Sequence, residues 1–357
     1  MHLFINLLAW SGFILLLFLL SRVVPGKKLQ GVPTPGSDGG WLYTLNGLNI
    51  FLIVILTTAV AEACRVSPLL YIRDNFLELL ISANIFAFVM TAVLYLAGTR
   101  AGGYAYRGLK RMLRDMIIGL ELNPRWWNVD LKLFSYRPSL TGLALINLSF
   151  AAYQYDKYGF LADSMLLYQS FTLIYILNYF QFEYGMLYTW DIIAERFGWM
   201  LVWGDYVLVP FFYSLPGWYL VDRTAPLPPA AAAGLVLMFL FGFWLFRGAN
   251  EQKHRFKQNR TARIWGKTAR TIDERLLVSG FWGIGRHLNY TGEICIYFAF
   301  VLTTGFDSIV PYLLPLWLTG LLVHRAWRDE LRCRQKYGVS WDRYTKTARF
   351  RMIPFIY

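Results

Sequence analysis

Long apolar stretches without a charged residue constrain this chain more than any other feature. Residues 3–20 form one such stretch, and residues 227–246 form another. A helix needs about 20 mainly apolar residues to cross the hydrocarbon core of a bilayer. Charged residues make up only 16% of the chain, whereas soluble domains carry about 25%. The sequence therefore predicts an all-α, polytopic membrane protein with no appended soluble domain.

Nine segments are candidate membrane spans. Residues 186–220 form the longest one, and a single helix of this length would measure about 52 Å, against a hydrocarbon core of about 30 Å. This segment is therefore either one span or two short helices broken near Gly204–Asp205. We expect a single transmembrane domain, 1–357, with nine or ten spans. The candidates are 3–20, 41–61, 76–98, 139–155, 159–182, 186–220, 227–246, 288–306 and 308–324.

The net charge of +13 is concentrated in two segments that adjoin predicted spans. Residues 247–275 and residues 321–357 each carry nine Lys/Arg against three acids. Nucleic-acid binding also requires positive charge, but this position favours lipid headgroups or an anionic small ligand. Loops rich in Lys and Arg lie on the cytoplasmic side, and the loop 99–138 carries eight of them. The loop 99–138 and the two basic segments lie on the same side of the membrane if 186–220 crosses once, which gives nine spans.

Cationic and aromatic residues recur at helical spacing in the C-terminal third. Lys253 and Lys257 are four residues apart and share one helix face just outside a span. Alone, this pair would serve equally well as a membrane anchor. The tail continues with Arg325, Arg328 and Asp329, also on one face, where clustered arginine favours bidentate recognition of phosphate or carboxylate.

Between these segments, residues 279–293 combine glycines with aromatic and polar side chains. Arg286 can bind a phosphate with two hydrogen bonds, Asn289 can recognise an amide, and Trp282 or Tyr290 can stack on a flat ring. Together the three segments predict a cleft for a dinucleotide or another adenine-bearing cofactor. A Gly-x-Gly-x-x-Gly motif is missing from the sequence, so we do not expect a Rossmann domain.

Acids inside apolar segments mark a second candidate site. Glu183, Asp191 and Asp205 lie within or beside predicted spans, and Tyr175 lies on the helix face that precedes them. Ionisable groups at membrane depth are costly, so each is a functional hypothesis by default. The four histidines are far apart in sequence and form no pair at metal-ligand spacing. We therefore expect no metal site.

The motifs resemble those of the membrane sterol reductases, a family that includes the C14, C7 and C24(28) enzymes and the membrane part of the lamin B receptor. The resemblance covers roughly residues 41–357. It rests on Gly248-Ala249-Asn250, on Gly-Phe-Trp-Gly followed by Arg-His-x-Asn-Tyr-x-Gly, and on the closing stretch from His324 to Tyr357. Earlier matches are the segments 121–125, 130–132, 189–192, 197–198 and 204–205.

This resemblance implies ten spans and an NADPH site that faces the cytoplasm. Residues 1–246 would form mainly the sterol side, and residues 247–357 would form mainly the cofactor side. Tyr175 would donate a proton to the sterol alkene, supported by Glu183 or Asp191. The residues that would bind the cofactor are Lys253, Lys257, Trp282, Arg286, His287, Asn289, Tyr290, Arg325, Arg328, Asp329 and Tyr337.

The resemblance also implies the reaction and shows where this chain departs from the family. The expected activity is reduction of a sterol C=C bond by protonation and hydride transfer, with C14–C15 or the side-chain C24 bond favoured and C7 also compatible. Family members usually carry Arg where this chain has Lys257, and the segment 178–183 departs from the usual pattern on the sterol side. Two alternatives are a membrane methyltransferase similar to the isoprenylcysteine carboxyl methyltransferases and a non-catalytic sterol-binding protein.

Overall fold

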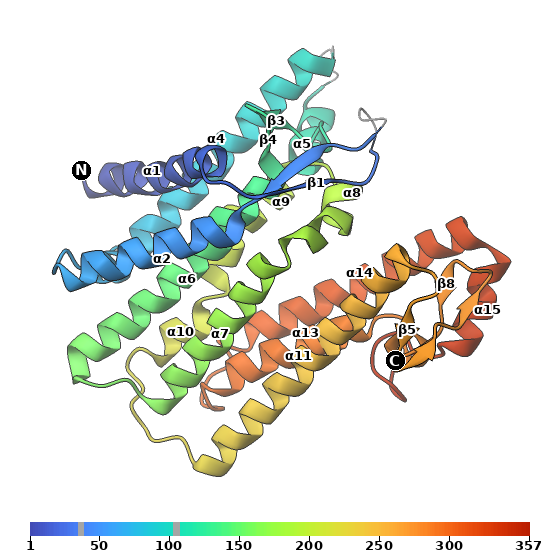
Figure 1. Cartoon of the computed structure of the whole chain (residues 1–357). Coiled ribbons are helices and arrows are strands. Elements are labelled where there is room, and N and C mark those ends of the chain that lie inside the picture. The colour runs from blue at the N-terminus through green and yellow to red at the C-terminus, as the bar shows by residue number, and fades with distance from the viewer. Residues whose placement is uncertain (35–38, 103–107) are drawn as a thin grey trace. The chain divides into compact units, whose positions relative to one another are not determined.

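The computed structural model describes residues 1–34, 39–102 and 108–357, and the chain is mainly helical, as the sequence predicts. It divides into two compact units, Met1–Thr224 (unit 1) and Ala225–Tyr357 (unit 2). Figure 1 labels the helices and strands of each unit.

Unit 1 is built mainly from helices that pack around α6 (Leu131–Tyr158). Asp130 starts α6, because its side chain accepts hydrogen bonds from the backbone N–H groups of Lys132 and Leu133. Gly159, in a left-handed conformation, ends it. The other helices of unit 1 are α1 (His2–Val23), α2 (Gly47–Ala63), α3 (Pro68–Asp74), α4 (Phe76–Gly102), α5 (Leu109–Ile118), α7 (Asp163–Gln181), α8 (Trp190–Ile193), α9 (Trp199–Trp203) and α10 (Leu215–Leu220).

Helix α6 is buried along most of its length and contacts α1, α2, α3, α7 and α10. Several of its polar side chains are bonded to neighbouring segments. The Gln154 amide, for example, donates to the carbonyl of Leu220 at 2.9 Å and accepts from the N–H of Ala162. Asn147 accepts from the hydroxyl of Tyr168 at 3.0 Å. Polar groups at membrane depth are tolerated when they are paired inside the bundle, so this helix can be both central and polar.

The segment 186–220 is not a single helix. The predicted alternative was a break near Gly204–Asp205, but the break lies earlier in the segment. The segment begins in the 3₁₀ helix η1 (Glu183–Tyr188), continues through α8, and loses helical structure at residues 195–198. At Gly204–Asp205 the helix does not break. There α9 runs directly into the π-helical segment η2 (Gly204–Phe212). The prediction of a break at Gly204–Asp205 is therefore wrong.

Unit 2 consists of three long helices and a small polar region. The long helices are α11 (Pro229–Gln258), α13 (Leu288–Leu302) and α14 (Leu313–Tyr337), and two short helices, α12 (Phe281–Ile284) and α15 (Val339–Thr347), complete the unit. Helices α11 and α13 approach closely at Gly242 and Gly292 (Figure 1). A Cβ atom on Gly292 would lie 2.6 Å from the carbonyl oxygen of Gly242, so this contact requires glycine.

Four two-stranded antiparallel hairpins in the described residues were not predicted from the sequence. They occupy connections between helices, and two close with tight turns whose central residues have positive φ, Trp127–Asn128 and Trp265–Gly266. Such φ values are typical of type I′ hairpin turns. The hairpins pair β1 (Lys27–Gln30) with β2 (Leu42–Leu45), β3 (Arg125–Trp126) with β4 (Val129–Asp130), β5 (Arg263–Ile264) with β6 (Lys267–Thr268), and β7 (Thr271–Ile272) with β8 (Leu276–Leu277).

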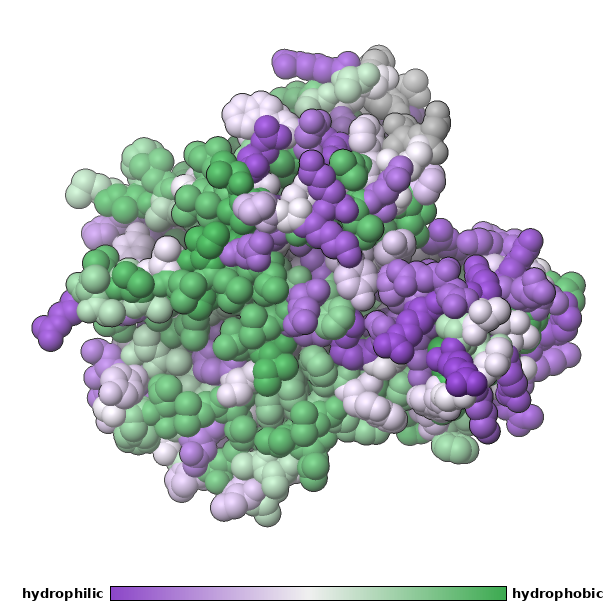
Figure 2. All heavy atoms as spheres, in the orientation of Figure 1, coloured by the Kyte–Doolittle hydropathy of each residue, from purple (hydrophilic) through white to green (hydrophobic). Residues whose placement is uncertain are grey.

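Three helices of the described chain, α1, α4 and α11, are long and apolar enough to cross a membrane. A fourth candidate is α2 together with α3, although these two helices meet at a bend of 96°. Figure 2 shows an almost continuous apolar surface over α1 and α2 of unit 1, where side chains such as Leu8, Leu56 and Val60 are more than half exposed. In unit 2, polar side chains gather over the hairpins and α15. These features are those of a membrane protein.

Candidate functional site

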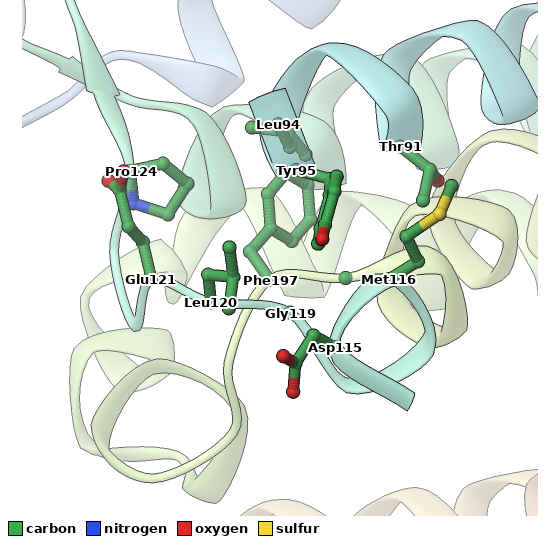
Figure 3. A pocket seen from close by; sticks show the side chains of 11 residues that line it. Thr91, Leu94, Tyr95, Asp115, Met116, Gly119, Leu120, Glu121, Pro124 and Phe197 are labelled. Carbon is green, nitrogen blue, oxygen red and sulfur yellow. The ribbon is translucent and has the colours of Figure 1, made fainter. Parts of the chain in front are cut away.

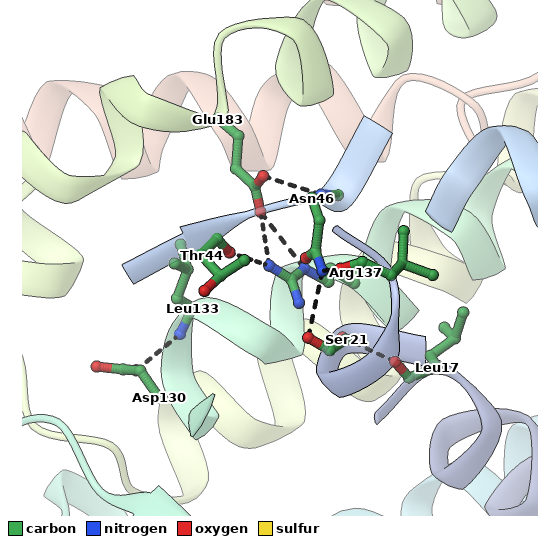
Figure 4. Close-up of polar contacts among 10 residues, drawn as sticks. Leu17, Ser21, Thr44, Asn46, Asp130, Leu133, Arg137 and Glu183 are labelled. Carbon is green, nitrogen blue, oxygen red and sulfur yellow. Dashed lines mark hydrogen bonds and ion pairs between the residues drawn. The ribbon is translucent and has the colours of Figure 1, made fainter. Parts of the chain in front are cut away.

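Glu183, predicted as a catalytic acid, lies in a buried ion pair with Arg137 (Figure 4). The shortest distance, from Arg137 Nη2 to Glu183 Oε1, is 3.2 Å, and both side chains are about 95% buried. The other carboxylate oxygen accepts a hydrogen bond from the N–H of Gly47, at the start of α2. Arg137 also donates to the carbonyl of Thr44. The Arg137–Glu183 pair thus joins η1, α6, β2 and α2.

Asp191 and Tyr175, the other two predicted catalytic residues, lie on separate elements of unit 1. Asp191, in α8, accepts a hydrogen bond from the hydroxyl of Tyr136 at 3.2 Å. The ring of Tyr136 also contacts that of Tyr179, with centroids 5.7 Å apart. The hydroxyl of Tyr179 is buried and has no hydrogen-bond partner. Tyr179 is thus connected to Asp191 through Tyr136, and Tyr175 is half-buried one turn earlier on α7.

Lys132 and Arg137 are buried cations beside the predicted acids, and the sequence reasoning missed them. Both were counted among the eight cations of the predicted loop 99–138, but both are buried in α6. Lys132 donates to the carbonyl of Glu195 at 2.6 Å, and Ser135, in the next turn, donates to Asp205. That loop ends at residue 130, and its residues 103–107 lie outside the described chain. An acid within a span requires a cationic partner, and this signal could have identified Arg137.

A pocket between α4, α5 and the segment before α9 adjoins the motif Phe197-Gly198 (Figure 3). Its volume is about 10 Å³, which leaves room for about one water molecule. Gly119 and Gly198 touch here through their backbones, since a Cβ on Gly198 would lie 2.2 Å from the nitrogen of Gly119. The two glycines are therefore needed for packing, and this pocket is too small for a substrate.

In unit 2, the predicted cofactor residues Lys253 and Trp282 lie against each other. The Lys253 ammonium lies 4.3 Å from the centroid of a Trp282 ring. The indole N–H of Trp282 donates to the carbonyl of Ala249 at 2.7 Å, and Gln252 accepts from the N–H of Phe281 at 2.9 Å. Gly248 allows this contact, because a Cβ there would lie 2.5 Å from the Phe281 ring. The motif around 248–253 therefore fixes the loop that carries Trp282.

Like charges gather where the basic ends of α11 and α14 come near each other. Lys257 is close enough to Lys253, Lys336 and Arg260 to be repelled by them, and Asp329 is the acid that offsets this repulsion. The charges of Lys253 and Lys336 are also close enough to Cys333 of α14 to interact electrostatically with its thiol. Positive charges with so few counter-charges favour the binding of an anion.

His287, Asn289 and Tyr290 lie at the start of α13. The ring of His287 stacks on that of Tyr290 at 5.1 Å. Burial, aided by the charges of Lys253 and Arg286, lowers the pKa of His287 to about 3, so its imidazole is neutral at physiological pH. His287 Nε2 and Asn289 Oδ1 are both buried without a hydrogen-bond partner. Buried polar atoms of this kind need an explanation such as a ligand or water.

Arg286 is bonded mainly to the chain itself. Its Nε atom donates to Glu330 at 2.6 Å, and its Nη1 atom donates to the carbonyls of Ala348 and Arg349 at 2.7 and 3.1 Å. Arg351 forms a second ion pair with Glu330, also at 2.6 Å. This network joins the loop before α13, α14 and the C-terminal segment. Arg286 therefore fixes the shape of the region in which His287 lies.

The remaining predicted cofactor residues lie along α14. Arg325 and Asp329 are half-buried, and Arg328 is exposed. Asp329 accepts a weak hydrogen bond from the Cys333 thiol, and Tyr337 stacks on Trp341 of α15. The structure thus collects the predicted cofactor residues within unit 2 and places Tyr175, Glu183 and Asp191 in unit 1.

The helical membrane architecture and the basic cluster are accompanied by a sequence match along nearly the whole chain. Residues 3–357 match the Ergosterol biosynthesis ERG4/ERG24 family, and the chain belongs to this family. The predicted resemblance to membrane sterol reductases is confirmed, and the chain is an oxidoreductase of that class. Because the match extends far beyond the C-terminal region, the methyltransferase alternative loses its basis.

Three relatives illustrate this similarity. A Delta(14)-sterol reductase of Arabidopsis thaliana is 42% identical over 94% of this chain and 92% of its own length. A Delta(14)-sterol reductase of Methylotuvimicrobium alcaliphilum is 40% identical over 93% of this chain and 79% of its own length. A 7-dehydrocholesterol reductase of Xenopus laevis is 37% identical over 98% of this chain and 79% of its own length.

Proposed function

We propose that this protein is an NADPH-dependent sterol reductase that saturates the C14–C15 double bond. The two Delta(14)-sterol reductases above are 42% and 40% identical to this chain and the 7-dehydrocholesterol reductase is 37% identical, which supports this bond over the C7 bond. The observation that carries the choice of cofactor is the group of cations formed by Lys253, Lys257 and Lys336 around one acid, Asp329. NADPH carries three phosphate groups, and such a cluster can neutralise them.

The residues of unit 2 fit the other parts of this cofactor as well. Trp282 is buried and oriented by its bond to Ala249, and because the Lys253 ammonium lies over its ring, it would hold Lys253 at the site. The unpaired atoms His287 Nε2 and Asn289 Oδ1 match a ligand with amide and hydroxyl groups. We propose that Tyr290, Arg325, Arg328, Asp329 and Tyr337 complete the site, and that Arg286 positions it. Bound NADPH would supply the hydride.

On the sterol side, we propose that Tyr175 donates a proton to one carbon of the alkene. Protonation leaves a tertiary carbocation at the other carbon, which then accepts the hydride. Asp191 would assist through the Tyr136 hydroxyl that it binds. Glu183 is paired with Arg137, so its role would be to hold the site in shape. Residues 1–246 would then form mainly the sterol side, and residues 247–357 mainly the cofactor side.

We also propose nine spans, with the cofactor site facing the cytoplasm. Helix α3 has only seven residues, and at 1.5 Å per residue it is too short to cross a bilayer. Residues 199–220 form one nearly continuous helical segment, which favours a single crossing. Four crossings then separate the basic region before α6 from the basic end of α11, so both lie on one side. The side of the membrane that these basic regions face can be tested by replacing the exposed residues Lys110 and Lys267 with cysteine and labelling each in intact and opened vesicles.

The test of the proposed function is an assay with purified protein, NADPH and sterols unsaturated at C14, C7 or C24, with products read by mass spectrometry. We expect a C14-saturated product. In Lys253→Ala, the apparent affinity for NADPH should fall by about tenfold or more, because a charged partner of the phosphate is lost. Lys346→Ala, an exposed lysine of α15, is the matched control. Equal affinity in both variants would contradict the assigned site.

A further inference from the structure

Unit 1 contains a second, larger cavity that none of the proposed catalytic or cofactor residues line. Its volume is about 130 Å³. It lies at the C-terminal end of α1, against β2, the β3–β4 hairpin and the first turns of α6, and Figure 4 shows several of the side chains around it. Its lining residues include Arg22, Tyr43, Arg125, Asn128, Asp130 and Arg137.

Two of the charged residues in this cavity are already paired within the chain. Asp130 accepts from the N–H groups of Lys132 and Leu133, each at 3.0 Å, and from the Tyr43 hydroxyl at 3.2 Å. Arg137 is paired with Glu183. Asp130 also forms a long ion pair with Arg125 Nη1, at 3.9 Å, so the cavity keeps a net positive charge that Arg22 and Arg125 supply.

The guanidinium of Arg125 is fixed in place and has an unused donor. Its Nη2 atom donates to the carbonyls of Leu42 and Asn128 at 3.2 and 2.6 Å. Its flat face lies over the rings of Trp41 and Tyr43, 5.0 and 5.4 Å from their centroids. Its Nη1 atom is buried without a hydrogen-bond partner, and the nearest oxygen of Asp130 is 3.9 Å away. A buried cationic donor without an acceptor is costly, so this atom favours an anionic ligand.

The surroundings place this cavity at the boundary of a membrane. Helix α1 is long and apolar enough to span, and Arg22 lies in its last turn. Trp126 and Trp127 at the hairpin tip are stacked on each other and more than half exposed. Tryptophan is enriched where membranes meet water, and Phe18 of α1 stacks on Trp126 at 5.0 Å.

The hairpin tip is held in an unusual conformation next to the cavity. Trp127 has φ +46° and Asn128 has φ +61°. Positive φ is typical of a type I′ turn, but a bulky residue such as Trp127 rarely adopts it, so this position is strained. Arg22 donates to the carbonyl of Trp127, so one arginine both lines the cavity and holds the strained turn.

We propose that this cavity binds a phosphate group, and that the group belongs to the headgroup of an anionic phospholipid. Arg125 Nη1 and Arg22 donate to the phosphate oxygens, and Trp126 and Trp127 lie in the interface beside the glycerol backbone. Arginine suits this role because its planar donors match phosphate oxygens. The site would anchor the end of α1 and the start of α6 to one leaflet.

The experiment measures thermal unfolding of the full chain in detergent with added phosphatidylglycerol, phosphatidylcholine or inorganic phosphate. A ligand that binds only the folded state raises the midpoint further as its concentration increases. We expect phosphatidylglycerol to stabilise more than phosphatidylcholine. In Arg22→Gln and Arg125→Gln, we expect half-saturation to require about tenfold more phosphatidylglycerol.

Two controls keep the result interpretable. Arg65→Gln removes an exposed arginine from the turn between α2 and α3 and should respond like the wild type. Arg22 is itself exposed, so Arg22→Gln serves if Arg125→Gln does not fold. An unchanged response in Arg22→Gln, or equal stabilisation by both lipids, would overturn the proposal. Stabilisation by inorganic phosphate without any by phosphatidylglycerol would overturn the lipid assignment.

Discussion

The buried charges around Glu183 in unit 1 and the basic cluster of unit 2 use charge in opposite ways. In unit 1, ionisable side chains such as Arg137, Glu183 and Lys132 are buried and bonded to the chain itself. In unit 2, Lys253 and Lys257 are exposed, carry the same charge and have few counter-charges. Charges of the first kind hold helices together, and charges of the second kind gain most from an external anion. The position of a charge therefore separates structural residues from those expected to bind the cofactor.

Their helix contacts differ as well. Unit 1 joins its helices through the polar side chains of α6, for example Asn147 and Gln154. Unit 2 joins α11 and α13 through the direct contact of Gly242 with Gly292. Small residues let helix backbones approach closely inside membranes, whereas polar residues connect helices by hydrogen bonds. Stability should thus be most sensitive to polar changes in unit 1 and to volume changes in unit 2.

The largest effect is expected from breaking the Arg137–Glu183 pair. Arg137→Met leaves the carboxylate of Glu183 buried without its cation, which should cost about 3–5 kcal/mol. This corresponds to a fall of about 10 °C in the unfolding midpoint. The double variant with Glu183→Leu removes both charges and should recover a large part of the loss. Thermal unfolding followed by circular dichroism measures both.

A matched control for that pair exists on the surface of unit 1. Lys157 and Asp222 form an ion pair at 2.6 Å, but 43% and 64% of their side chains are exposed. Exposed pairs contribute little because water screens them, so Lys157→Ala should leave the midpoint unchanged. If Lys157→Ala were as damaging as Arg137→Met, burial would not be the property that makes the charges of unit 1 structural.

The next largest effect is expected at the glycine contact of unit 2. In Gly292→Ala, the new methyl group would lie 2.5 Å from the nitrogen of Phe246 and 2.6 Å from the oxygen of Gly242. Such overpacking should cost about 1–3 kcal/mol. Gly234→Ala, on the neighbouring helix α11 and with no atom within 4 Å of the added Cβ, should instead stabilise by up to about 1 kcal/mol. A stable Gly292→Ala variant would show that the two helices can separate without loss.

A smaller effect is expected from His287, which should make the stability of unit 2 fall as the pH is lowered. Its folded-state pKa is about 3 and its unfolded value is about 6.5, so the unfolded chain binds one more proton between these values. Stability contributed by the neutral imidazole is therefore complete above pH 6.5 and declines as pH falls, at about 1.4 kcal/mol per unit. His287→Gln should flatten this decline in midpoints measured from pH 7 to pH 4.5. His2→Gln, at the exposed start of α1, should retain the wild-type slope.

These residues also show what the sequence could and could not predict. Apolar stretches predicted α1, α4 and α11, because the length and hydropathy of such helices are local properties. The helical spacing of Lys253 and Lys257 likewise indicated one basic face. The partner of Glu183 could not be predicted, since Arg137 is 46 positions away and stood among surface cations. Arg286 was expected at a phosphate, but only tertiary structure reveals its bonds to Glu330 and Ala348.

The smallest effect tests whether the cations of unit 2 are directed toward a ligand. A guanidinium can bind a phosphate through two hydrogen bonds, whereas an ammonium such as that of Lys257 acts as a point charge. Lys257→Arg keeps the charge, so it should leave the unfolding midpoint unchanged. It should lower the KM for NADPH about threefold, a change in binding free energy smaller than that of one charged hydrogen bond. Lys346→Arg makes the same chemical change on α15 and should alter neither value. A change in stability without a change in KM would mean that Lys257 stabilises the fold, as Arg137 does in unit 1. The two units would then not differ in how they use charge at this residue.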